Sequence, residues 1–198
     1  MKNISVIILA GGLSSRMGKD KRNVRIAGKS LFSYSLELAL AFSEDIIISS
    51  NDRLPEFEHH KVVSDKITGA GPVQAIISSL PHITSPAAVV LTSDMPFVTI
   101  HQLKLLAREF TSDKIISFIL DGKIQPFPSL FPASFLKLIQ LQYENGLHSM
   151  KRMIAALPSM AITADRESKE KFINLNRPEE LEKAINKYGN TRNIRKES

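Results

Sequence analysis

The hydrophobic positions of the chain fall into two alternating patterns. Some runs are short, β-branched and almost unbroken, which predicts strands buried on both faces. They cover residues 4–9, 45–49, 61–64, 87–93 and 114–120. Between them, apolar residues recur at helical spacing, which predicts amphipathic helices. These cover residues 30–42, 72–80 and 99–110, and the second of them starts with Pro72, a favoured first helical residue.

Strand and helix in alternation are typical of βαβ units, so we predict a single α/β domain with a mostly parallel, twisted sheet flanked by helices. The domain is expected to span residues 1–187, with a disordered basic tail at 188–198. Its second half is less regular. There we predict a hairpin that turns at Asp121-Gly122 and helices near 133–143, 147–156 and 178–187.

Several polar residues and glycines follow directly after these strands. Sheets of this kind bind ligands at the carboxyl ends of their strands. The residues expected to share that rim are Gly11, Gly12, Asn51, Asp65 and Asp94.

The composition excludes several classes of protein. The 198 residues include no cysteine, which rules out disulfides, thiolate metal sites and cysteine nucleophiles. No apolar run approaches the ~18 residues of a membrane span. We therefore expect a cytoplasmic protein that does not contact membranes.

The net charge of +6 is concentrated rather than spread. Residues 16–29 carry six basic side chains and one acidic one. The sequence has no tryptophan and no basic helix with interleaved aromatic residues, so specific nucleic-acid binding is not favoured. A small polyanion bound at one loop fits this distribution better.

The basic stretch begins in the loop "LAGGLSSRMGKDK", directly after the first predicted strand. It matches neither a Walker A loop, because Lys19 precedes Asp20 rather than a hydroxyl residue, nor the G-x-G-x-x-G fingerprint. Adjacent glycines nevertheless let the backbone approach a ligand, and Arg16 and Lys21 supply cationic donors for phosphate. A solvated basic loop is the alternative, and the position after a buried strand favours phosphate binding.

The same residues resemble the signature of the nucleotidyltransferases that include molybdenum cofactor guanylyltransferase. The resemblance continues in order along most of the chain. The segments that carry it are "LAGGLSSRMGKDK", "SSND", "SDKITGAGP", "LTSDMPF", "GKIQPFPSLF" and "FINLNRPEEL". It implies a Rossmann-like nucleotidyltransferase fold, and transfer of GMP from GTP to the phosphate of molybdopterin with release of pyrophosphate.

The resemblance also implies roles for single residues. Gly11, Gly12, Arg16 and Lys21 would hold the triphosphate, and Asp94 would bind Mg²⁺, although an aspartate before x-Pro is also common in turns. The remaining roles concern the base, the nucleoside and the acceptor. Leu9 and Ala10 would lie beside guanine, Asn51 and Asp65 would contact the nucleoside, and the acceptor would meet Gln125, Pro126, Asn174 and Asn176. For Asn51 and Asp65 a local loop cap is the competing interpretation.

Three segments depart from the usual motifs: Gln74 and Ala75 replace smaller residues, Arg22 and Asn23 interrupt an apolar stretch, and Arg177 replaces a capping threonine. They put nucleotide and acceptor specificity in question more than catalysis. A cytidylyltransferase on the same acceptor and a sugar-phosphate nucleotidyltransferase remain open. A non-catalytic nucleotide-binding partner of molybdoenzymes or their chaperones is the alternative of a different class.

Overall fold

The fold is built on one seven-stranded sheet. The computed structural model describes residues 3–11, 25–52, 57–65, 69–165, 167–175 and 178–188. The strands, in the spatial order β5-β4-β1-β6-β8-β7-β9, are β5 (Lys61–Val63), β4 (Ile46–Ser49), β1 (Ser5–Leu9), β6 (Ala87–Thr92), β8 (Lys123–Pro132), β7 (Ile115–Leu120) and β9 (Ser159–Thr163). All five residues of the central strand β1 are buried, as its unbroken apolar run predicts.

The sheet is mostly parallel, which confirms the prediction. β1 pairs in parallel with β4 and β6, β4 pairs in parallel with β5, and β7 with β9. β8 is antiparallel to both of its neighbours, β6 and β7. The carboxyl ends of β5, β4, β1 and β6 therefore meet at one edge, which we call the carboxyl edge.

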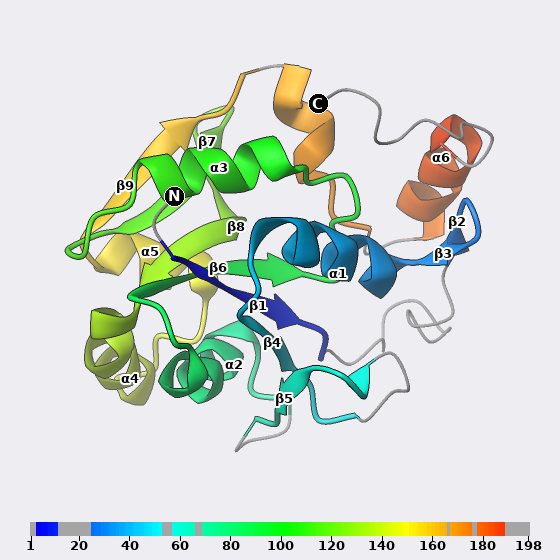
Figure 1. The fold of residues 1–198 in the computed structure, drawn as a ribbon. Coiled ribbons are helices and arrows are strands. Elements are labelled where there is room, and N and C mark those ends of the chain that lie inside the picture. The colour runs from blue at the N-terminus through cyan, green and yellow to red at the C-terminus, as the bar shows by residue number, and fades with distance from the viewer. Residues whose placement is uncertain are drawn as a thin grey trace.

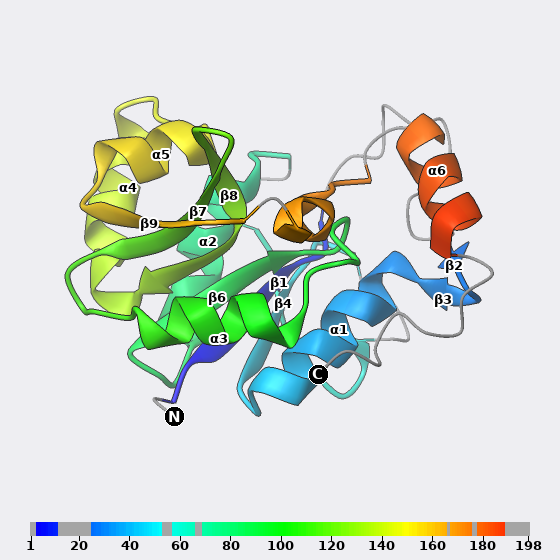
Figure 2. The same cartoon turned by 90° about the horizontal axis from the view of Figure 1, so that it is seen from above.

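Helices cover both faces of the sheet (Figure 1). One face carries α1 (Leu31–Phe42) and α3 (Ile100–Arg108), and the other carries α2 (Pro72–Ser79), α4 (Leu136–Glu144) and α5 (Met150–Ala156). The 3₁₀ turns η3 (Leu80–His82), η4 (Ala133–Phe135) and η5 (Glu167–Phe172) connect elements. The closing helix α6 (Pro178–Tyr188) stands apart from the sheet, beside the small hairpin of β2 (Arg25–Ile26) and β3 (Lys29–Ser30) (Figure 2).

Local chemistry fixes where the helices begin. The Ser30 hydroxyl caps α1 by accepting the Ser33 N–H at 3.1 Å. Thr99 and Gln102 form the predicted capping box at the start of α3. α2 begins after Gly71, whose φ of 86° suits glycine, with Pro72 in the first turn. These boundaries agree with the sequence predictions.

Three strands were not predicted, namely β9 and the two strands of the β2–β3 hairpin. β9 is a short edge strand whose burial alternates between exposed and half-buried, so it lacks an unbroken apolar run. The β2–β3 hairpin has two residues in each strand and lies in the basic stretch, where hydrophobic periodicity gives no signal. The predicted β7–β8 hairpin is confirmed, with left-handed backbone at Asp121 and Gly122 as a two-residue turn requires.

The apolar core has a large part and a small part. The large part fills both faces of the sheet. The small part lies at the carboxyl edge, where the β2–β3 hairpin, α1 and α6 meet, and we call it the carboxyl-edge cluster. Its buried members are Ile26, Leu31, Tyr34, Phe97 and Leu175, with Leu181 packed against them.

A polar network centred on Asp45 connects three segments at the opposite, amino end of the sheet. Asp45 Oδ2 accepts the Thr84 N–H at 2.8 Å, the Thr84 hydroxyl at 2.7 Å and the Ser5 hydroxyl at 2.5 Å. Burial acts to raise the pKa of Asp45, but these hydrogen bonds and the Lys61 charge outweigh it and lower the pKa. The network fixes the start of β1 to the turns before β4 and β6.

Candidate active site at the carboxyl edge

The structure brings together those predicted rim residues that it describes, which excludes Gly12. Ala10 and Gly11 follow β1, Asn51 follows β4, and Asp65 follows β5. Asp94 follows β6 on the other side of β1. Four adjacent parallel strands thus deliver these residues to one edge, as the topology of the sheet predicts.

The first turn after β1 is held by one carbonyl group. The Ser49 carbonyl accepts the N–H groups of Ala10 and Gly11 at 2.9 Å and 3.1 Å. Both amides are therefore engaged inside the protein. What residues 10 and 11 can still offer a ligand is their carbonyl oxygens.

Gly11 has no internal reason to be glycine among its described neighbours. A Cβ there would lie 3.8 Å from the Ser49 carbonyl oxygen and 3.9 Å from Ser50 Cα, which are ordinary contacts. Gly11 is also exposed and has no left-handed backbone. Close approach of a ligand is a remaining reason for glycine at this position.

Asn51 and Asp65 form a pair across the β4 and β5 ends. Asn51 Oδ1 accepts the Asp65 N–H at 2.8 Å, which fixes the orientation of the amide and leaves its NH₂ group for other partners. Ser49 donates its hydroxyl to Asp65 Oδ1 at 3.3 Å. Burial raises the pKa of Asp65 despite that hydrogen bond. The pair presents a donor next to an acceptor.

Asp94 lies between the end of β1 and the C-terminal segment. The Ser93 N–H donates to the Leu9 carbonyl at 3.3 Å, and the Leu175 N–H donates to the Asp94 carbonyl at 2.9 Å. The side chain is half-buried, with Oδ1 shielded from solvent. The backbone of Asp94 is therefore fixed from both sides.

The donor set can be tested against the expected Mg²⁺. No group of three or more histidine, aspartate or glutamate side chains in the described residues could form a protein cage for a metal. Mg²⁺ is commonly held by one or two carboxylates together with substrate phosphates and water. A single shielded carboxylate at a strand end fits that mode of binding.

The expected acceptor residues reach the same edge from the other half of the chain. The β6–β8 register runs from Ala87–Pro132 to Val90–Ser129, so Gln125 and Pro126 at the start of β8 lie toward the Asp94 end. Asn174 precedes Leu175, and its shielded Oδ1 accepts no hydrogen bond from a described residue. A buried oxygen of this kind is suited to a ligand that donates hydrogen bonds.

Some of the predicted residues cannot be placed at the site, either because the structure does not describe them or because their described contacts are internal. Gly12, Arg16, Lys21 and Asn176 lie outside the described residues, as do Arg22, Asn23 and Arg177. Gln74 is buried and donates from Nε2 to Ser78 Oγ at 3.3 Å, one turn along its own helix. Ser49 and Leu175 were not predicted from the sequence, because serine and leucine at strand ends and in loops carry no local signal.

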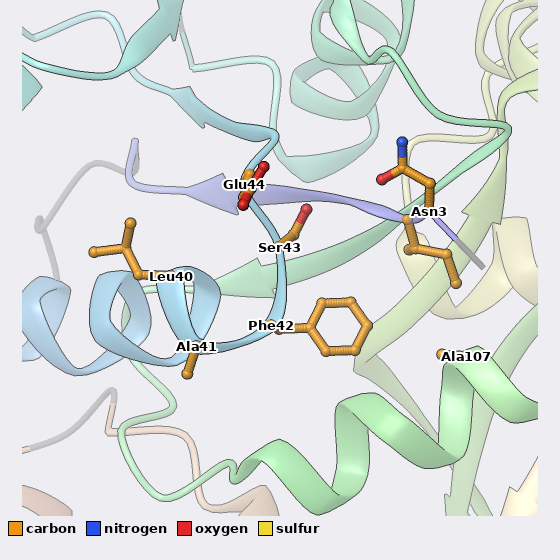
Figure 3. Close-up of a pocket in the computed structure, with 8 residues that line it drawn as sticks. Asn3, Leu40, Ala41, Phe42, Ser43, Glu44 and Ala107 are labelled. Carbon is orange, nitrogen blue, oxygen red and sulfur yellow. The ribbon is translucent and has the colours of Figure 1, made fainter. Parts of the chain in front are cut away.

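A separate hollow lies at the other end of the sheet (Figure 3). Its lining includes Asn3 and Ile4 at the amino end of β1, Phe42 at the end of α1, and Ala107 on α3. Because it lies opposite the carboxyl edge, it is distinct from the candidate active site.

The fold and the edge define a class of protein. A mostly parallel sheet covered by helices, with an amide–carboxylate pair and a further carboxylate at its carboxyl edge, is typical of α/β nucleotide-binding enzymes.

No helix in the described ranges combines the length and the apolar character needed to span a membrane.

The chain belongs to the family of MobA-like NTP transferase domains, whose model matches residues 6–161. It is accordingly a nucleotidyltransferase. It is 30% identical over 202 aligned residues, covering 96% of this chain and 98% of the relative, to a probable molybdenum cofactor guanylyltransferase of Natranaerobius thermophilus.

Solved structures share the fold. Molybdopterin-guanine dinucleotide biosynthesis protein A from Archaeoglobus fulgidus matches with a TM-score of 0.78 and 22% identity, over 92% of this chain and 97% of that one. The 2-C-methyl-D-erythritol 4-phosphate cytidylyltransferase of Thermus thermophilus matches with a TM-score of 0.71 and 14% identity, over 93% and 98%. At these identities the likeness concerns the fold alone.

Proposed function

We propose that this nucleotidyltransferase acts in molybdenum cofactor biosynthesis and transfers GMP from GTP to the phosphate of molybdopterin, releasing pyrophosphate. The observation that carries the proposal is the convergence of Asn51, Asp65 and Asp94 at the ends of neighbouring parallel strands. The name of the Natranaerobius thermophilus relative, a probable molybdenum cofactor guanylyltransferase, supports the choice of donor and acceptor.

The hydrogen-bonding groups at the edge favour guanine. Because the amides of Ala10 and Gly11 already bond to Ser49, their carbonyl oxygens and the Asp65 carboxylate supply mainly acceptors. Guanine presents adjacent N1–H and N2–H₂ donors, whereas the corresponding edges of cytosine, adenine and uracil present only one donor group each. The Asn51 NH₂ group supplies a donor to O6 or to the sugar.

Asp94 is the residue that would hold Mg²⁺. When bound, the ion supplies neutralisation of the triphosphate charge near the α-phosphate. The protein contributes the Asp94 carboxylate. The backbone around Asp94 is fixed by the hydrogen bonds from Ser93 N–H to the Leu9 carbonyl and from Leu175 N–H to the Asp94 carbonyl. Arg16 and Lys21 are proposed to neutralise the remaining phosphate charge.

The acceptor enters from the β8 side in this proposal. Gln125, Pro126, Asn174 and Asn176 orient the molybdopterin so that its phosphate oxygen attacks the α-phosphorus of GTP. The bond to the β-phosphate breaks, and pyrophosphate leaves with that bridging oxygen. No general base is needed, because the acceptor phosphate is already largely ionised near neutral pH, and positioning can carry the step.

The test is an assay of the full chain with Mg²⁺, molybdopterin and each of GTP, CTP, ATP and UTP. We expect pyrophosphate release and dinucleotide formation with GTP, and loss of both in Asp94→Asn. Asp113→Asn, an exposed carboxylate before β7, serves as the matched control and should retain activity. A preference for CTP would refute the guanylyl assignment, and no turnover with any nucleotide would refute the proposed function.

A further inference from the structure

Leu175 connects parts of the carboxyl edge that are far apart in the sequence. Its side chain is 1% exposed and packs in the carboxyl-edge cluster, which includes Phe97 from the turn after Asp94. Its N–H donates to the Asp94 carbonyl at 2.9 Å. The residue is therefore held by its side chain on one side and by its amide on the other.

The cluster itself rests on fixed elements. Tyr34 lies on α1, is buried, and donates its hydroxyl to the Ile26 carbonyl at 2.8 Å. Ser35, the next residue of α1, donates to the Thr92 carbonyl at 3.1 Å, two residues before Asp94. The apolar seat of Leu175 is thus built on the same helix that contacts the end of β6.

Asn174 shares this attachment because it directly precedes Leu175. Its Oδ1 is shielded and accepts no hydrogen bond from the described part of the chain. A displacement of Leu175 would move Asn174 and would release the Asp94 backbone on one side. The Asn174 amide and the Asp94 carboxylate therefore share one anchor.

We propose that Leu175 is a positioning residue that sets the acceptor-side Asn174 relative to the Asp94 carboxylate. The inference rests on the proposed function, in which these residues serve the acceptor and the metal. In-line transfer depends on placement, and a misplacement of about 1 Å can cost about a hundredfold in rate. A leucine with no polar group would then govern the chemistry through its packing.

The test compares Leu175→Ala with Leu157→Ala in the full chain. Leu157 is also buried, at 7% exposure, but it packs in the large core at the end of α5. Both substitutions remove the same apolar atoms from a packed environment. Leu175→Val is included as a milder variant in case Leu175→Ala does not fold, and Leu175→Met as the volume-conserving variant.

Two readouts separate positioning from simple stability. In Leu175→Ala we expect faster amide hydrogen exchange across residues 93–97, and kcat with molybdopterin lowered about tenfold or more while the GTP dissociation constant changes much less. Leu175→Met should recover most of kcat. Leu157→Ala should leave exchange at 93–97 and kcat close to those of the unsubstituted protein.

Three results would overturn the inference: unchanged exchange at 93–97 in the Leu175 variants, equal kcat losses in Leu175→Ala and Leu157→Ala, or a GTP dissociation constant that rises as much as kcat falls. If the unsubstituted protein transfers no GMP, the proposed function is wrong. The exchange comparison then still decides whether Leu175 anchors the Asp94 segment.

Discussion

The side chain of Asn51 binds the backbone of Asp65: the Asp65 N–H donates to Asn51 Oδ1 at 2.8 Å. This bond leaves the NH₂ group of Asn51 and the carboxylate of Asp65 as neighbouring polar groups at the carboxyl edge. A donor and an acceptor held in fixed relation can discriminate between hydrogen-bonding ligands. The pair therefore supplies a direct test of nucleotide recognition.

Replacing Asn51 by Asp should weaken GTP binding about tenfold or more. An aspartate retains an oxygen for the Asp65 N–H, but it removes the NH₂ donor and adds a negative charge beside Asp65. Isothermal titration calorimetry with GTP and Mg²⁺ measures the change. The distant control Asp113→Asn should bind GTP normally, and normal binding by Asn51→Asp would exclude the NH₂ group from nucleotide recognition.

The ionised Asp65 side chain should lower the stability of the unliganded protein at neutral pH, relative to an uncharged side chain at this position. Because burial raises its folded-state pKa above 3.8, its contribution to stability is present at low pH and is lost as the pH rises through the folded-state value. Asp65→Asn should therefore have a higher Tm than the unsubstituted protein at pH 7, with the difference shrinking toward pH 4. Scanning calorimetry at both pH values tests this, and a lower Tm at pH 7 would contradict it.

The pH dependence of stability that comes from Asp45 should have the opposite sign. Its folded-state pKa is lowered below 3.8, so its stabilising contribution is present above pH 3.8 and is lost as the pH falls through the folded-state value. Asp45→Ala should lower the Tm by a few degrees at pH 7, because Thr84 and Ser5 lose their acceptor, which costs about 1 kcal/mol or more. The loss should fade on acidification. GTP binding should persist, since Asp45 lies at the amino end of the sheet.

Gly11→Ala should separate stability from binding. The described neighbours leave room for a Cβ, so the Tm should change little, while GTP binding should weaken because the added methyl group occupies space at the proposed nucleotide site. Gly146→Ala is the matched control: its φ of 85° makes alanine strained there, and Gly146 follows α4 and is not among the proposed site residues. It should lower the Tm and leave binding unchanged. A Gly11→Ala protein that loses stability but binds normally would contradict the ligand-approach interpretation.

Much of the candidate site could be predicted because strand direction carries information about position. The residue that ends each buried strand is visible in the sequence, and a parallel sheet places all such ends on one edge. Asn51, Asp65 and Asp94 lie there as expected. Their proposed roles come from resemblance to a family, since an isolated Asn or Asp after a strand is equally suited to capping a loop.

The sequence alone determined the type and order of most elements, β9 and the β2–β3 hairpin excepted, because hydrophobic periodicity and capping residues act over one or two turns of chain. Tertiary structure alone decided that Ser49 binds the amides of Ala10 and Gly11, that β9 joins the sheet edge, and that Leu175 holds Asp94. Each of these joins segments that are distant in sequence. Such contacts depend on the register and packing of the whole sheet, which no local pattern contains.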